Sequence, residues 1–239
     1  MICYTLIGDT MSKQIWDKKA FEQALYQDID PSWAGFFFQE RSKPYYQDLI
    51  DKVYEAYNQY PCYPEVSVIF RVFKEISLSH LKVLIMGQDP YHTKDVADGL
   101  AFSSKIKLAP SLRNIYKELH RDLGVENVSS DLTSWSKQGV MLLNSALSVE
   151  EGKANAHQKY GWNEFVIGLL GYLSCKEDLV YILWGNHAKS YQSYINNGFI
   201  IEGYHPSPFS AKHFYGGSYF SRCNEYLLKQ GIQPIDWRI

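Results

Sequence analysis

The sequence predicts an α/β fold built on parallel strands that are covered on both faces. First, residues 81–86 form an unbroken apolar run, and a run of this length without polar alternation suits a strand buried on both sides. Second, three more apolar runs, near 140–143, 179–183 and 199–203, also end in polar residues. Third, the segments between the runs have helical periodicity, so right-handed crossovers should bring all the strand ends to one edge of a single sheet.

The expected helices are recognised by apolar residues that recur every three or four positions. They span residues 12–60, 62–76, 107–124, 161–174 and 187–195. The segment 107–124 is the clearest, because Pro110 lies at its entry and Gly124 at its exit. Its apolar face is expected to run as far as Leu123.

The chain is interpreted as one domain that covers residues 1–239, because it has no internal repeat and no low-complexity linker. Within this domain we expect a helical N-terminal part over 1–60 and the core over 61–239. No apolar stretch approaches membrane-spanning length. Residues 1–16 have an apolar start but neither a basic region nor a small-residue cleavage site, so no secretion signal is expected.

Composition restricts the classes of function only weakly. Lys and Arg number 24 and Asp and Glu 26, and this net charge of −2 does not indicate a nucleic-acid binder. Only the contacting face of such a protein needs to be basic, however. The cysteines lie far apart and form no CxxC pair: Cys3, Cys62, Cys175 and Cys223. Their spacing argues against a structural zinc site and a disulfide framework, and it favours a reducing compartment.

A tight polar turn, GQDPYH at residues 87–92, follows the first predicted strand. An amide, a carboxylate, a phenol and an imidazole are crowded there, and open α/β sheets place their ligands at such strand ends. Asn144, Asn186 and His205 come at or just after the ends of the other predicted strands. We therefore expect these residues and Asp89 to converge at one edge of the sheet.

Two of these segments resemble the signatures of family-1 uracil-DNA glycosylases. GQDPYH at 87–92 is similar to the water-activating signature, HPSP at 205–208 is similar to the second signature, and three further family blocks lie between them. The resemblance runs from about Tyr63 to the C-terminus. It implies a central four-stranded parallel sheet flanked by helices on both faces.

The resemblance also implies an activity, which is hydrolysis of the N-glycosidic bond of deoxyuridine in DNA as a step of base excision repair. A base inside the duplex cannot be reached, so it must first be flipped out. Asp89 would position the attacking water and stabilise an oxocarbenium-like transition state. His205 would act as a neutral electrophile on uracil O2. Uracil leaves without redox chemistry, so neither a cofactor nor a metal is implied.

Four residues are implied in uracil recognition. The amide of Asn144 would pair with O4 and N3–H of uracil, and cytosine would be rejected because its polar groups would stay unpaired. Phe102 would stack on the base, which is worth ~1–3 kcal/mol. Tyr91 would close against the C5 edge, where the methyl group of thymine would clash. Gln88 would support the base or sugar pocket.

Four further residues are implied in DNA binding. Ser111, Asn186 and Ser207 would contact phosphates, and Phe209 would enter the base stack as an apolar wedge. The chain departs from the family pattern at three of these places. The proline loop before Ser111 is reduced to Pro110, Asn186 replaces a serine, and Phe209 replaces a leucine. His92 is expected to be a packing or DNA-side residue.

Two other classes of function stay open at this point. One is a catalytically silent DNA-binding or replication scaffold of the same fold, which the three departures would suit. The other is a metal-dependent hydrolase that would use the following residues: Asp89, His92, Asp95, His157 and His205. Their spacing does not resemble a compact ligand motif. His157 is otherwise expected to be structural or close to DNA.

The expected partners follow from the resemblance as well. They are uracil-containing single- or double-stranded DNA and protein inhibitors that mimic DNA, and the protein is expected to be a monomer that does not associate with membranes. The compartment would be the cytoplasm of a bacterium, or the nucleus for a viral or eukaryotic source.

Overall fold

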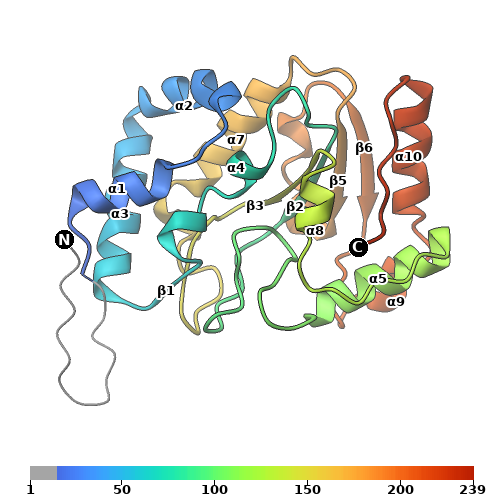
Figure 1. The fold of residues 1–239 in the computed structure, drawn as a ribbon, viewed down its shortest axis with the longest axis horizontal. Helices are drawn as coiled ribbons and strands as arrows, with labels where there is room; N and C mark the ends of the chain where they lie inside the picture. Colours follow the sequence, from blue (N-terminus) through green and yellow to red (C-terminus); the bar gives the residue numbers. More distant parts are fainter. Residues whose placement is uncertain (1–14) are drawn as a thin grey trace.

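The computed structural model describes residues 15–239 of the chain (Figure 1). The expectation that the N-terminus carries no secretion signal depends on residues 1–14, which lie outside this range, as does Cys3. Among residues 15–239, no helix combines the length and the apolar character that a membrane crossing requires.

A four-stranded parallel sheet forms the centre of the molecule, as the sequence predicts. Its strands are β2 (Val83–Gly87), β3 (Val140–Asn144), β5 (Val180–Trp184) and β6 (Phe199–Gly203). They are arranged in the order β3-β2-β5-β6, and every neighbouring pair is parallel. Every residue of β2, β3 and β5 is buried, which accounts for the continuous apolar runs in the sequence.

The helices flank this sheet, and the direction of the connections explains how. The chain passes from β2 to β3 through α5 (Pro110–Leu123) and then crosses back over β2 to β5 through α7 (Trp162–Leu173). For right-handed crossovers, this reversal puts α5 and α7 on opposite faces. The C-terminal helix α10 (Tyr219–Lys229) contacts α5, β5 and β6. Figure 1 shows the loops that follow the strands gathered along the lower edge of the molecule.

The described part of the N-terminal segment is helical, as predicted. It contains α1 (Lys18–Tyr26), the 3-10 turn η1 (Pro31–Trp33), α2 (Ala34–Arg41) and α3 (Pro44–Gln59). Pro31 begins η1 and Pro44 begins α3. Proline is tolerated at the first position of a helix because an N–H group there would have no hydrogen-bond partner within the helix. Phe36 and Phe37 of α2 pack against Phe165 of α7, with ring centroids 5.3 and 6.1 Å away. These aromatic contacts attach the helical part to α7.

Several elements are shorter than the sequence predicts. Instead of one helical stripe over 62–76, the chain forms β1 (Cys62–Tyr63), the 3-10 turn η2 (Val66–Val68) and α4 (Val72–Glu75). The backbone at the start of this segment pairs with β4 (Val149–Glu150) instead of forming a helix.

The segment 187–195 is likewise divided. It contains α8 (Gly185–Lys189) and the 3-10 turn η4 (Gln192–Tyr194). Leu123 is 38% exposed, contrary to expectation, because it is the last residue of α5 before the left-handed turn at Gly124.

Five of the described elements have no counterpart among the predictions. They are α6 (Thr133–Ser136), β4, the 3-10 turn η3 (Gln158–Tyr160), α9 (Ala211–Phe214) and α10.

Candidate active site

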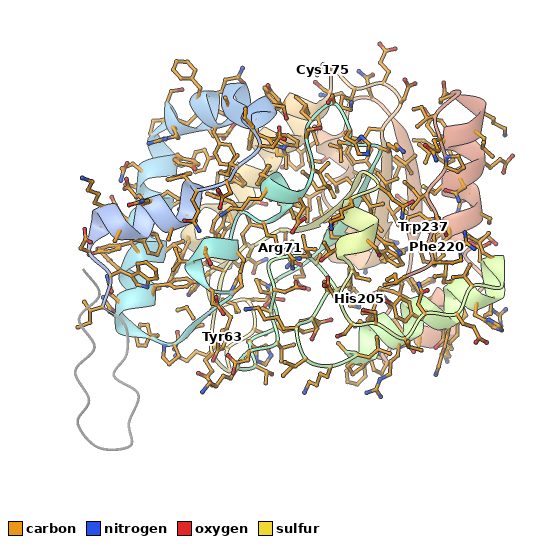
Figure 2. The ribbon with its side chains drawn as sticks, viewed as in Figure 1. Tyr63, Arg71, Cys175, His205, Phe220 and Trp237 are labelled. Carbon is orange, nitrogen blue, oxygen red and sulfur yellow. The ribbon has the colours of Figure 1, made fainter. Side chains whose placement is uncertain are left out.

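A cavity of about 240 Å³ opens at the carboxyl edge of the sheet. Eight of the residues singled out in the sequence line it: Gln88, Asp89, Tyr91, His92, Phe102, Ser111, Asn144 and His205. Figure 2 shows the His205 side chain among the loops below the strands, near the start of α5. Of the four residues expected to converge, Asp89, Asn144 and His205 meet at this cavity, as predicted, whereas Asn186 does not line it.

The cavity lies at the carboxyl ends of β2 and β3, and His205 reaches it from the loop that follows β6. Gly87 and Asn144 are paired there in register, and Asn144 is only 5% exposed. A Cβ atom on Gly87 would collide with Oδ1 of Asn144 and lie 2.8 Å from Cβ of Ala101. Glycine at this position leaves the space that the Asn144 amide occupies.

The turn after β2 is held by hydrogen bonds at two neighbouring residues. The carbonyl oxygen of Gln88 accepts from the backbone N–H of Ala146 at 2.9 Å and from Oγ of Ser145 at 2.8 Å. Its side-chain amide donates to Oδ1 of Asn155 at 2.6 Å. Oδ2 of Asp89 accepts from the backbone N–H of Asn155 at 2.7 Å. One carboxylate oxygen of Asp89 is thereby fixed within the protein.

His205 is held in one tautomer. The backbone N–H of Ser207 donates to its Nδ1 at 3.0 Å, so the proton of the neutral ring is on Nε2. Burial lowers the pKa of His205, and the neighbouring His187 lowers it further. Gly185, at φ +85°, makes room for the ring, because a Cβ there would lie 2.8 Å from Cβ of His205. His205 therefore presents a neutral N–H donor.

A second imidazole, His187 of α8, supports the same turn from behind. Its Nε2 lies 2.7 Å from Oγ of Ser145. Because the Ser145 hydroxyl already donates to the carbonyl of Gln88, His187 is the donor in this contact. Burial lowers the pKa of His187, and Asp89 opposes the shift. The sequence interpretation assigned no role to His187 or Ser145.

Two aromatic residues form part of the cavity wall. The Tyr91 hydroxyl donates to the carbonyl of Phe102 at 3.3 Å, and burial raises the pKa of Tyr91 well above its ordinary value. The ring of Phe102 meets Trp184 edge-on at 5.7 Å and lies 6.3 Å from the ring of His205.

Phe102 has a backbone φ of +66°, which costs a non-glycine residue about 1–3 kcal/mol. The loop around it is fixed by Asp98, which is 3% exposed. Asp98 accepts from the backbone of Leu100 at 3.0 Å and from Ser103 at 2.5 Å, and it pairs with Arg71 at 3.1 Å. These contacts hold the conformation that places the Phe102 ring at the cavity.

The four residues expected to bind DNA occupy different positions. Ser111 lines the cavity in the first turn of α5, where no side chain caps the helix. Asn186, Ser207 and Phe209 lie outside the cavity lining. Asn186 is exposed, Ser207 is half-buried, and the side chain of Phe209 is 97% exposed.

One face of α5 fastens the segment that carries these loop residues. Asn114 donates to the carbonyl of Pro206 at 2.8 Å. The buried carboxylate of Glu118 accepts from two backbone N–H groups after α9, at 2.7 and 3.0 Å. Asp122 accepts from the first two N–H groups after Tyr219, both at 2.9 Å.

His157 is a structural residue, in agreement with the first of its two expected roles. It is 1% exposed, its Nδ1 lies 2.9 Å from Oγ of Ser148, and its ring stacks on Tyr160 at 4.4 Å. No hydrogen-bond partner for its Nε2 is present among residues 15–239. Burial lowers the pKa of His157 to about 4.

This buried histidine makes the stability depend on pH. Between pH 4 and the ordinary value of 6.5, the unfolded chain binds more protons at this position than the folded chain does. The contribution is complete above pH 6.5 and is lost as the pH falls toward 4. The difference of 6.5 − 4 corresponds to about 3 kcal/mol. Urea unfolding at several pH values should show a steeper loss for the wild type than for His157→Gln, and parallel curves would contradict it.

The described residues contain no ready metal centre. Between residues 15 and 239, no three His, Cys, Asp or Glu side chains form a group that could hold a metal ion. The five residues of the metal-hydrolase alternative therefore do not form such a group. The cavity combines three groups. They are the Asp89 carboxylate, of which only Oδ2 is hydrogen-bonded within residues 15–239, the neutral N–H donor of His205 and the buried amide of Asn144. This set suits attack by water on a bond whose leaving group becomes negatively charged.

Comparison with known proteins agrees with this geometry. The sequence model described as "Uracil DNA glycosylase superfamily" matches residues 73–228. A protein of Campylobacter jejuni named uracil-DNA glycosylase is 44% identical over 218 residues, which is 88% of this chain and 94% of that protein.

Two solved structures share the fold. The crystal structure of mimivirus uracil-DNA glycosylase is similar with a TM-score of 0.84 and 26% identity, covering 92% of this chain and 89% of that one. A mimivirus UNG variant in complex with UGI has the same score and identity, with 92% and 91% covered. Together with the sequence match, these likenesses show that the chain belongs to the uracil-DNA glycosylase superfamily.

Proposed function

We propose that this protein is an enzyme that releases uracil from DNA by hydrolysing the N-glycosidic bond of deoxyuridine, which leaves an abasic site for base excision repair. The observation that carries the proposal is the single cavity in which Asp89, Asn144 and His205 meet at the carboxyl edge of the sheet. Membership of the superfamily supports the same conclusion.

In this proposal the cavity recognises uracil by shape and by hydrogen bonding. The Asn144 amide offers a donor and an acceptor, which match O4 and N3–H of uracil and mismatch the same positions of cytosine. The buried position of Asn144 makes the mismatch costly, because unpaired polar groups would be left in a dry pocket. Phe102 stacks on the base, and Tyr91 stands where the methyl group of thymine would lie.

Two residues assist cleavage of the N-glycosidic bond. One stabilises the positive charge that develops on the sugar, and the other stabilises the negative charge that develops on the base. Asp89 uses its remaining carboxylate oxygen to hold the attacking water and to stabilise the positive sugar of the transition state. His205 donates its Nε2–H to uracil O2, where negative charge develops as the base leaves. The neutral state of His205, which burial and His187 favour, makes it a hydrogen-bond donor and not a proton donor. Gln88 supports the base or sugar beside Asp89.

The DNA backbone is bound both at the cavity, through Ser111, and on the surface outside its lining. Ser111 and the uncapped first turn of α5 suit one phosphate, and Asn186 and Ser207 suit others. The exposed ring of Phe209 enters the stack where the flipped nucleotide was. Flipping costs a few kcal/mol, which the phosphate contacts and the wedge offset.

The proposal extends to partners and organisation. The substrate is single- or double-stranded DNA that contains uracil, and a protein inhibitor that covers the same DNA-binding face would compete with it. The complex of a similar mimivirus protein with UGI supports the second point. The protein is proposed to act as a monomer with residues 1–60 and 61–239 in one domain, and one continuous hydrophobic core from Phe21 to Trp237 supports this arrangement.

The direct test is uracil release from an oligonucleotide with a single uracil, beside matched thymine and cytosine strands, with EDTA present. We expect release from the uracil strand alone, because only uracil matches the Asn144 amide and the Tyr91 wall. No release, with DNA binding retained, would contradict the proposal and favour the silent DNA-binding scaffold. Activity that disappears in EDTA would instead indicate a metal-dependent hydrolase.

A further inference from the structure

We propose that Asn155 is the positioning residue of the active site, which orients Asp89 through its backbone N–H and Gln88 through its side chain. The inference rests on the proposed function, since it concerns how the water-activating carboxylate is aimed. Asn155 does not line the cavity and is distant from Asp89 in sequence. Its role would be exerted through the two residues that it holds.

The two hydrogen bonds converge on consecutive residues of the turn. The N–H of Asn155 donates to Oδ2 of Asp89 at 2.7 Å, and Oδ1 of Asn155 accepts from Nε2 of Gln88 at 2.6 Å. Charge-assisted bonds to a carboxylate are among the stronger hydrogen bonds of proteins. With Oδ2 held, rotation of the Asp89 carboxylate is restricted, and Oδ1 is the oxygen left for water.

The backbone conformation of residue 155 makes both bonds possible at once. Its φ is +61°, a left-handed conformation that Asn tolerates better than most residues. In this conformation the N–H faces Asp89 while the short amide side chain reaches Gln88. A residue that disfavours positive φ would turn the N–H away, even though the N–H itself is common to all residues except proline.

The segment that carries Asn155 is itself anchored on both sides. The N–H of Gly152 donates to the carbonyl of His92 at 2.9 Å, which joins the segment to the far end of the same turn. On the other side, the buried ring of His157 bonds to Ser148 and stacks on Tyr160. The conformation of residue 155 is thus set by contacts on both sides of it, and the buried His157 anchors the segment.

The kinetic consequence concerns chemistry and not binding. The side-chain and N–H hydrogen bonds of Asn155 go to Gln88 and Asp89, not to Phe209 or the phosphate-facing residues, so its loss should leave DNA affinity nearly unchanged. A reacting group displaced by about 1 Å can lose about 100-fold in rate. We therefore expect variants at this position to lower kcat with little change in KM.

Three variants separate the two contacts. Asn155→Gly keeps the N–H and tolerates positive φ, so it removes only the bond to Gln88, and we expect kcat to fall about tenfold. Asn155→Val disfavours positive φ and should disturb both bonds, so we expect a loss of about 100-fold. Asn155→Asp restores an acceptor for Gln88 but adds a second carboxylate next to Asp89. It should recover most of the rate at high pH and move the acid limb of the kcat profile to higher pH.

The control is Asn196→Gly, which makes the same replacement at an exposed loop position outside the cavity lining. It should behave as the wild type does. Thermal unfolding of each variant shows whether a loss of kcat comes from loss of fold. A lower kcat at unchanged KM, in a variant that unfolds at the wild-type temperature, is a result that a purely structural role would not produce.

A double-mutant cycle adds a test of mechanism. If Asn155 acts through Gln88, then Gln88→Ala and Asn155→Gly should each lower kcat. The kcat of the double variant should then be no lower than that of the less active single variant. Wild-type kcat in both Asn155→Gly and Asn155→Val would overturn the inference. These outcomes differ from failure of the proposed function, in which the wild type itself would release no uracil.

Discussion

Replacement of Asp89 by Asn should reduce kcat for uracil release by about a thousandfold and leave DNA binding nearly unchanged. The amide has the shape of the carboxylate and keeps an oxygen that can accept from Asn155, so the turn after β2 should hold its conformation. It lacks the negative charge that stabilises the sugar cation, and it is a poor acceptor for the proton of water. The effect should therefore fall on the chemical step.

Single-turnover assays with excess enzyme measure this step apart from product release. Asp95→Asn is the matched control, because Asp95 is exposed, lies in the same loop and is absent from the cavity lining. If Asp89→Asn bound uracil-containing DNA and still released uracil at the wild-type rate, the proposed mechanism would be wrong.

Replacement of His205 by Leu should reduce kcat by about 10²–10³-fold, the usual cost of removing one donor to a developing oxyanion. The leucine side chain fills similar space but has no N–H for uracil O2. The hydrogen bond from Ser207 to Nδ1 places the ring proton on Nε2, and Leu cannot reproduce that arrangement. Ground-state binding of DNA depends on other residues and should change little.

His205→Gln is the informative companion, because its amide restores a donor and should recover part of the rate. His80→Leu serves as a control, since His80 is exposed and lies outside the cavity. Because burial keeps His205 neutral, the wild-type rate should not rise as the pH is lowered through the ordinary histidine range. Equal rates for His205→Leu and the wild type, or a rate that rises on acidification, would contradict an electrophilic role for neutral His205.

The sheet could be predicted because its strands are buried on both faces. An unbroken run such as 81–86 has few alternatives once helices flank it, and the crossover rule then places the strand ends together. Asp89, Asn144 and His205 could be placed in one cavity for this reason. Their chemistry is carried by side-chain types that the sequence displays directly.

The supporting contacts could not be predicted in the same way. Asn155 reaches Asp89 through a backbone N–H, which leaves no mark in the sequence, and its positive φ is imposed by contacts on both sides. His187 follows Asn186, for which the sequence resemblance implies a phosphate contact. The hydrogen bond from His187 depends on the position of the Ser145 hydroxyl, which the sequence does not reveal. In 62–76, pairing of β1 with β4 took precedence over helical periodicity, which is a tertiary effect.

The hydrogen bonds from α5 to the segment that follows β6 affect which molecule, the protein or the DNA, changes conformation when they bind. Asn114, Glu118 and Asp122 fasten the segment that carries His205 and Phe209 to the helix that begins at the cavity. These hydrogen bonds hold the loops that meet DNA in one conformation, so most of the change of shape on binding should occur in the duplex. Flexible pyrimidine–purine steps deform more easily than stiff A-tracts, so the mechanics of the neighbouring sequence would decide which uracils are reached first.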